Sequence, residues 1–152
     1  MSHTAAEYDH LDTLLRQWGA WHEKHYADAV LPHEAAFCAM MGDQPAGSRI
    51  LCAEMSPRVY EINLAVQMLR VRYRRALFVW YVIQTKPEGG YWTVTEKAEL
   101  FGCTANALRK RVARGKVVVL RKFYQIREAR ALQKRQLHDK SVQACKTVSA
   151  AP

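Results

Sequence analysis

The chain has 152 residues, a formal net charge of +9 at neutral pH and an apolar share of 49%. Such a length suffices for one domain with a substantial core, and the apolar share excludes a disordered chain. No apolar run approaches the roughly 18 residues of a membrane span, and the polar, acidic start does not resemble a signal peptide, so we expect an intracellular protein.

The N-terminal quarter is acidic and is expected to be helical. Residues 1–8 are interpreted as a frayed end, and apolar residues follow at helical steps from Asp9. Gly19 costs about 1 kcal/mol inside a helix relative to alanine, so it indicates either a close approach or a bend. The burial habits of tryptophan favour the core over an interface for Trp18 and Trp21. The apolar positions are Leu11, Leu14, Leu15, Trp18 and Trp21.

No metal or other cofactor is expected. The segment His22–His25 (HEKH) lacks the two histidines four residues apart that a zinc-binding helix uses, and no further ligands follow. The cysteines do not form a CxxC pair, so they are interpreted as free, mostly buried thiols. They are Cys38, Cys52, Cys103 and Cys145.

The middle of the chain predicts more helices. Residues 31–41 indicate a short helix, residues 42–49 a loop, and residues 50–55 are too short to assign. Ser56–Pro57 is a helix start, with serine as the cap and proline in the first turn. The apolar pattern continues to Ile83, as one long helix or as two with a break near Arg70–Arg72.

The stretch from Thr93 to Arg114 predicts a helix-turn-helix. Thr93 and Glu96 have the capping-box spacing, and Gly102 can adopt the left-handed backbone that ends a helix. Thr104 can cap a second helix, in which Leu108 and Val112 share one face while the other faces are cationic. In this motif the start of the second helix enters the major groove of DNA.

The basic C-terminal part is also expected to be largely helical. Gly115 is expected to break or weaken the second helix, and residues 115–120 fit a short strand or a helix equally well. Helix resumes over Phe123–His138, and the tail from Ser141 is expected to be disordered. The fold class is therefore all-α, with a helical acidic segment (1–55), a helix-turn-helix body (56–125) and a basic helix with a flexible tail (126–152).

Charge is distributed very unevenly, which bears on function. Residues 1–56 carry a net −5, residues 57–96 +3 and residues 97–140 +10. A concentrated positive charge is the electrostatic footprint of nucleic-acid binding. The chain has no Gly-rich phosphate loop, no GxSxG and no obvious pair of catalytic carboxylates, so an enzyme is not expected.

Two resemblances refine this expectation. Residues 56–83 together with 92–123 resemble region 4 of sigma factors. Residues 14–25, with Trp18–Gly19–Ala20–Trp21, resemble the opening of the small Q-type late-gene antiterminators of lambdoid phages. The resemblance spans roughly residues 11–125. The chain lacks the cysteine cluster of the zinc-binding branch, so it matches the zinc-free branch, and residues 85–92 make a longer linker than sigma factors usually have.

The resemblance implies a function in transcription. Such proteins bind a DNA element near a phage late promoter, load onto paused RNA polymerase that still holds sigma, and modify the RNA-exit channel so that terminators are read through. The implied partners are double-stranded DNA, bacterial RNA polymerase with sigma, and nascent RNA, with no membrane, in the host cytoplasm or nucleoid. The alternatives are a stand-alone helix-turn-helix repressor or sigma-like activator, and a helical adaptor that does not bind DNA.

The resemblance also assigns candidate DNA-binding residues by position. Asparagine can read adenine and arginine can read guanine through paired hydrogen bonds, while the more distant cations suit phosphates or RNA. The base-reading candidates lie at the start of the second helix: Ala105, Asn106, Arg109 and Lys110. Thr104, just before that helix, is a further DNA-binding candidate. The phosphate or RNA candidates are Arg111, Arg114, Lys116, Arg121 and Lys122.

Overall fold

The computed structural model describes residues 3–27 and 55–149, with side chains for 3–24 and 55–143. This part of the chain forms five helices: α1 (Ala5–Ala27), α4 (Pro57–Gln67), α5 (Val71–Tyr81), α6 (Val94–Leu100) and α7 (Ala105–Ser149). Its only extended pairing is an isolated bridge between Thr85 and Tyr91. The all-α prediction is therefore confirmed for the described residues. The predicted helix 31–41, loop 42–49 and residues 50–54, with Cys38 and Cys52, lie outside them.

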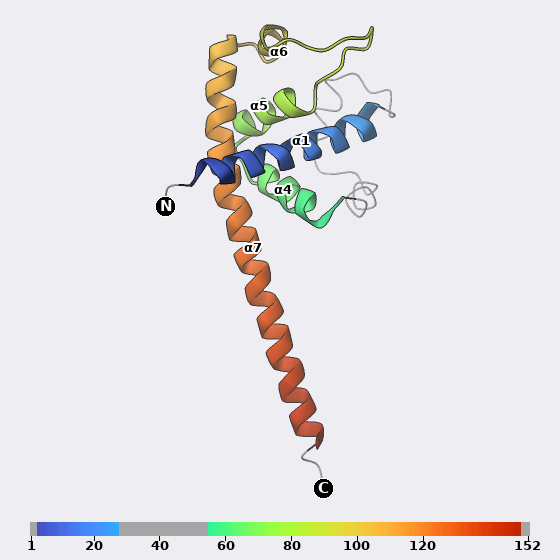
Figure 1. The fold of residues 1–152 in the computed structure, drawn as a ribbon, viewed down its shortest axis with the longest axis vertical. Coiled ribbons are helices and arrows are strands. Elements are labelled where there is room, and N and C mark those ends of the chain that lie inside the picture. Colours follow the sequence, from blue (N-terminus) through green and yellow to red (C-terminus); the bar gives the residue numbers. More distant parts are fainter. Residues whose placement is uncertain (1–2, 28–54, 150–152) are drawn as a thin grey trace.

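The helices are organised around α7, which is the longest of them. Figure 1 shows α1, α4 and α5 grouped against one half of α7, with α6 beside its N-terminal end. The other half of α7 extends well beyond the remaining helices. None of the described helices combines the length and apolar character that a membrane span requires.

The start of α1 differs from the predicted frayed end. Thr4 caps the helix, because its hydroxyl accepts from the Glu7 backbone N–H at 3.3 Å while its own N–H donates to Glu7 Oε2 at 2.6 Å. This reciprocal arrangement is a capping box. Glu7 Oε1 also accepts from the Tyr124 hydroxyl of α7 at 2.8 Å. Hydrogen bonds, first from the Thr4 backbone and then from Tyr124, lower the pKa of Glu7 to about 2.

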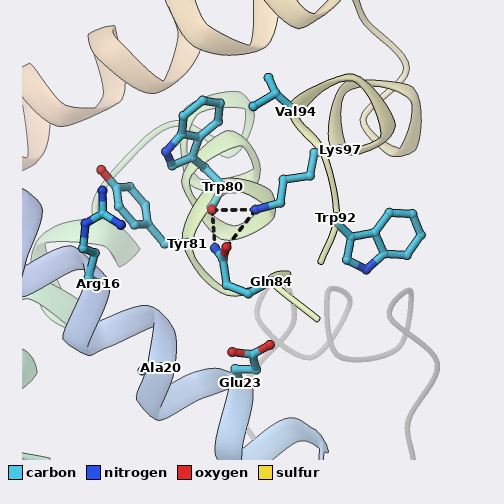
Figure 2. A pocket seen from close by; sticks show the side chains of 9 residues that line it. All are labelled: Arg16, Ala20, Glu23, Trp80, Tyr81, Gln84, Trp92, Val94 and Lys97. Atoms are coloured by element: carbon cyan, nitrogen blue, oxygen red, sulfur yellow. Dashed lines mark hydrogen bonds between the residues drawn. The ribbon is translucent and has the colours of Figure 1, made fainter. Parts of the chain in front are cut away.

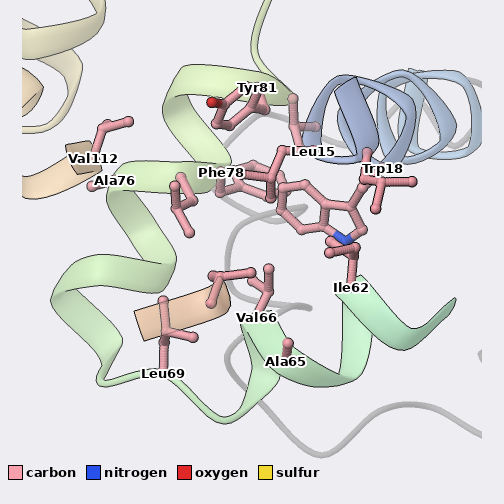
Figure 3. Packing of buried hydrophobic residues seen from close by; sticks show 14 of the residues in the cluster. Leu15, Trp18, Ile62, Ala65, Val66, Leu69, Ala76, Phe78, Tyr81 and Val112 are labelled. Carbon is pink, nitrogen blue, oxygen red and sulfur yellow. The ribbon is translucent and has the colours of Figure 1, made fainter. Parts of the chain in front are cut away.

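The core combines apolar side chains from α1, α4, α5, α6 and α7 with one buried polar cluster. Trp18 is completely buried and lies between α1, α4 and α5 (Figure 3). Its indole N–H donates to Asn63 Oδ1 at 3.0 Å, and His22 Nε2 lies 3.2 Å from the same oxygen. The core prediction is confirmed for Trp18, while Trp21 is half-buried at the edge of the core.

Gly19 allows α1 to approach the end of α5 at backbone distance. A Cβ atom added at Gly19 would lie 2.2 Å from the carbonyl oxygen of Tyr81. No side chain fits there without displacing one of the two helices. Of the two alternatives for Gly19, the structure therefore shows the close approach.

The chain turns between α4 and α5, so the apolar run from Ser56 to Ile83 forms two helices. Ser56 accepts from the Val59 backbone N–H at 3.4 Å and Pro57 begins α4, as predicted. Helix α4 ends at a cap on Met68, and Arg70 has extended backbone angles before α5 begins at Val71. The break between the two helices spans residues 68–70, next to the predicted position near Arg70–Arg72.

Helix α7 corrects two expectations. The helix continues through Gly115. This residue is buried against α5, where an added Cβ atom would lie 3.3 Å from the Leu77 side chain. Packing of Val119 and Leu120 into the core keeps residues 115–120 helical. The predicted disordered tail is wrong as far as Ser149, because no glycine or proline interrupts the sequence between Lys116 and that residue.

The two buried helical glycines give a matched test of the close approach. We expect Gly19→Ala to lower the free energy of unfolding by about 2–4 kcal/mol, because the new Cβ collides with backbone. Gly115→Ala meets only a leucine side chain and gains helix propensity, so it should stay within about 1 kcal/mol of the wild type. Urea unfolding of the three proteins measures both changes, and equal stabilities would contradict the packing described for Gly19.

Candidate nucleic-acid interface

Residues 93–108 form two helices joined by a tight turn, with the local contacts that the sequence predicts. Thr93 accepts from the Glu96 backbone N–H at 3.3 Å, and its own N–H donates to Glu96 Oε2 at 2.8 Å. Gly102 has a φ of 71°, in the left-handed region that favours glycine. Thr104 caps α7 by accepting from the Ala107 backbone N–H at 3.2 Å. These contacts fix where α6 ends and α7 begins.

Apolar and cation–π contacts hold the two helices together. Ala98 and Leu108 are buried between them, and Cys103 is half-buried in the turn. Two guanidinium groups lie near the Phe101 ring, Arg75 at 5.7 Å and Arg111 at 5.1 Å from its centre. Leu100, near the end of α6, is half exposed. The turn is therefore packed against both α5 and α7.

Three base-reading candidates and the phosphate candidate Arg114 lie on the outward side of α7. Because a helix turns by about 100° per residue, Asn106, Arg109, Lys110 and Arg114 project away from the face that buries Leu108. All four of these polar side chains are exposed. The remaining candidates divide by burial: Thr104 and Arg121 are exposed, and Ala105, Arg111, Lys116 and Lys122 are half-buried.

Lys116 is engaged inside the protein. Its ammonium lies 2.8 Å from Asp12 Oδ1 of α1, and the Tyr81 hydroxyl of α5 donates to the same carboxylate oxygen. Arg16 Nε contacts Asp12 Oδ2 at 2.8 Å. Asp12 therefore joins three helices. We leave Lys116 out of the proposed DNA surface because Asp12 already neutralises its charge.

The contacts of Asp12 give it an unusual acidity. Burial alone would raise the pKa of Asp12, but hydrogen bonds from Lys116, Tyr81 and Arg16 outweigh it and lower the pKa to about 2. The charged form of the carboxylate is thus favoured in the folded protein. Burial and the hydrogen bond to Asp12 raise the pKa of Tyr81.

The part of α7 beyond the core forms a basic arm, which we define as residues 127–143. Nearly all of its side chains are exposed. Arg130, at the start of the arm, contacts Glu61 of α4 at 2.8 Å and lies 5.5 Å from the centre of the Tyr60 ring. The exposed cations are Arg127, Lys134, Arg135 and Lys140. The arm is therefore attached at its base and offers its cations to solvent.

The sequence analysis did not identify Asp12 or Lys97, because both side chains contact residues elsewhere in the chain. Asp12 is 104 residues from Lys116. Lys97 is buried against α5 and donates to the carbonyl oxygen of Trp80. A lysine beside the apolar Ala98 was the only local signal of that burial. No group of three or more metal-ligating side chains converges within the described residues.

Comparisons with known protein families, with curated proteins and with solved structures find no match to this chain.

Acid unfolding tests the Asp12 cluster. Because the folded-state pKa of Asp12 is lowered, the stability it contributes is present above its unfolded pKa and is lost as pH falls toward about 2. After discounting for solvent screening, we expect the free energy of unfolding to fall by about 1–2 kcal/mol between roughly pH 5 and pH 2 because of Asp12.

An amide at position 12 should remove the part of the pH dependence of stability that Asp12 contributes, while the part from Glu7 remains. Urea unfolding across that pH range should show a shallower loss of stability in Asp12→Asn than in the wild type. Asp9→Asn, on the exposed side of the same helix, is the matched control and should follow the wild type. A wild-type slope retained by Asp12→Asn would contradict the assignment.

Proposed function

We propose that this chain binds double-stranded DNA through the helix-turn-helix formed by α6 and α7. The observation that supports the proposal most directly is the exposure of Asn106, Arg109 and Lys110 on the first turns of α7. The capped connection between α6 and α7 leaves these side chains exposed to solvent, as insertion of the helix into a major groove requires. Arg114 and Arg121 lie further along the exposed side and suit phosphate contacts.

We further propose that the protein acts as a phage late-gene antitermination factor. It would bind a promoter-proximal DNA element, load onto paused RNA polymerase that holds sigma, and modify the RNA-exit channel. The resemblance of residues 11–125 to Q-type antiterminators motivates this proposal. The basic arm supports it, because a continuous helix joins the DNA-reading turns to a second cationic surface at the opposite end of α7 (Figure 1).

Substitutions on the outward side of α7 test DNA reading. We expect Asn106→Ala and Arg109→Ala each to weaken specific binding by about 1–3 kcal/mol, because each removes a paired hydrogen bond to a base edge. Arg72→Ala, which removes an exposed cation from α5, is the matched control and should bind nearly as the wild type does. Fluorescence anisotropy at fixed salt concentration measures the affinities. Unchanged affinity in both α7 variants would refute groove reading by these turns.

Substitutions in the arm separate antitermination from promoter-bound regulation. The double variant Lys134→Ala, Arg135→Ala should keep specific DNA binding and lose read-through of a terminator downstream of a late promoter, because its arm lacks two exposed cations. In vitro transcription with purified polymerase and sigma measures read-through. If the wild type binds the template but neither increases read-through nor migrates with elongating polymerase, the protein is a stand-alone regulator instead.

A further inference from the structure

Lys97 of α6 is a buried cation whose partners are all uncharged. Its side chain is 6% exposed, and its ammonium donates to the Trp80 carbonyl oxygen and to Gln84 Oε1, both at 3.1 Å. An ammonium has three N–H donors, so one is left over. Lys97 forms no ion pair with any carboxylate in the described part of the chain. Buried charges in proteins are normally paired.

Lys97 lies in the wall of a pocket between α1, α5 and α6. The pocket measures about 440 Å³, a size typical of small-molecule sites. Figure 2 shows Trp80, Trp92 and Lys97 along one part of the wall, with Arg16 and Glu23 from α1 on the other. The site thus combines two large aromatic side chains with a buried ammonium.

The charges around the pocket favour a singly charged anion. Glu23 is held by Thr85, which donates from its backbone N–H at 3.1 Å and from its hydroxyl at 2.8 Å. Burial lowers the pKa of Lys97, and the charge of Glu23 offsets part of this effect. Arg16, with 74% of its side chain exposed, shares the single negative charge of Asp12 with Lys116. The α1 side of the pocket therefore keeps a positive charge that Asp12 does not compensate. A carboxylate compensates one buried ammonium, whereas a doubly charged phosphate would be repelled more strongly by Glu23.

We propose that this pocket binds a carboxylate attached to a flat apolar group. The carboxylate accepts the remaining N–H of Lys97 and is attracted by Arg16, while the apolar group lies against Trp80 and Trp92. The site is separate from the outward side of α7, and the proposal does not depend on DNA binding. The ligand is either a free small carboxylate or an acidic side chain beside an aromatic one in a partner protein.

The full-length protein allows a direct test by NMR and calorimetry. The probes are phenylacetate, its neutral analogue phenylacetamide, and an acetylated, amidated Glu-Phe-Glu tripeptide. We expect saturable binding of phenylacetate, of the tripeptide or of both, with shifts in the indole N–H signals of Trp80 and Trp92. The Trp18 signal should not move, because Trp18 is completely buried in the core and does not line the pocket. Phenylacetamide should bind at least about tenfold more weakly than phenylacetate.

Variants separate a binding role of Lys97 from a purely structural one. Lys97→Met should weaken carboxylate binding at least about tenfold, and Lys134→Met, which removes the same charge from the arm, should bind as the wild type does. Ala20→Trp places an indole at an exposed position of the pocket wall and should also abolish binding, so the test survives if Lys97→Met fails to fold.

Each outcome bears on the proposal. Binding of phenylacetate alone identifies a free small ligand, and binding of the tripeptide alone identifies a partner protein. The proposal is overturned if neither carboxylate probe binds at about 60 mM, on the order of 10 times the dissociation constant that about 0.3 kcal/mol per non-hydrogen atom gives phenylacetate. It is equally overturned if Ala20→Trp and a folded Lys97→Met retain binding, or if phenylacetamide binds as well as phenylacetate.

Discussion

The continuity of α7 constrains the whole molecule. One helix of 45 residues carries the exposed turns after Thr104, the apolar face that closes the core, and the basic arm. At 1.5 Å per residue it is about 68 Å long. Because each residue turns by about 100°, burial of Leu108, Val112 and Val119 fixes which side of the first turns faces solvent. The direction of the arm relative to the candidate DNA surface follows from the same helix.

Polar contacts from α1 hold this helix in place. Asp12 joins α1 to Lys116 of α7 and to Tyr81 of α5, while Gly19 brings α1 against the α5 backbone. The buried hydrogen bonds of Asn63 with Trp18 and His22 connect α1 to α4. A buried polar cluster specifies one arrangement of helices, since displacement would leave its donors and acceptors unpaired. The acidic N-terminal helix is therefore part of the support of the candidate interface.

The sequence predicted features whose causes are local. The Thr93–Glu96 capping box, the left-handed Gly102 and the Ser56–Pro57 helix start each depend on residues within a few positions of one another, so their geometry follows from spacing. The same signal was overlooked at Thr4–Glu7, where the terminal position suggested fraying. Exposure of Asn106 and Arg109 agrees with the helical pattern that buries Leu108; whether these residues read DNA stays a prediction.

Features that depend on distant residues escaped prediction. Gly115, with a helical cost of about 1 kcal/mol, predicted a break or a weakening of the helix; the break does not occur, and the residue packs against Leu77. The close contact of Gly19 was one of two open alternatives, because nothing near it in sequence indicates Tyr81. No local pattern singled out Lys97, which lies buried against Trp80 and Gln84. Such positions are set by tertiary packing.

Selection of bound duplexes from a pool of random DNA sequences tests the central claim, that the outward side of the first turns of α7 reads DNA. The account predicts that the wild-type protein enriches one defined sequence. It also predicts that Arg109→Lys, which cannot form the paired hydrogen bonds of a guanidinium, loses the preference at one position of that sequence and keeps the rest. Recovery of no enriched sequence by the wild type, or of an identical sequence by the variant, would contradict the account.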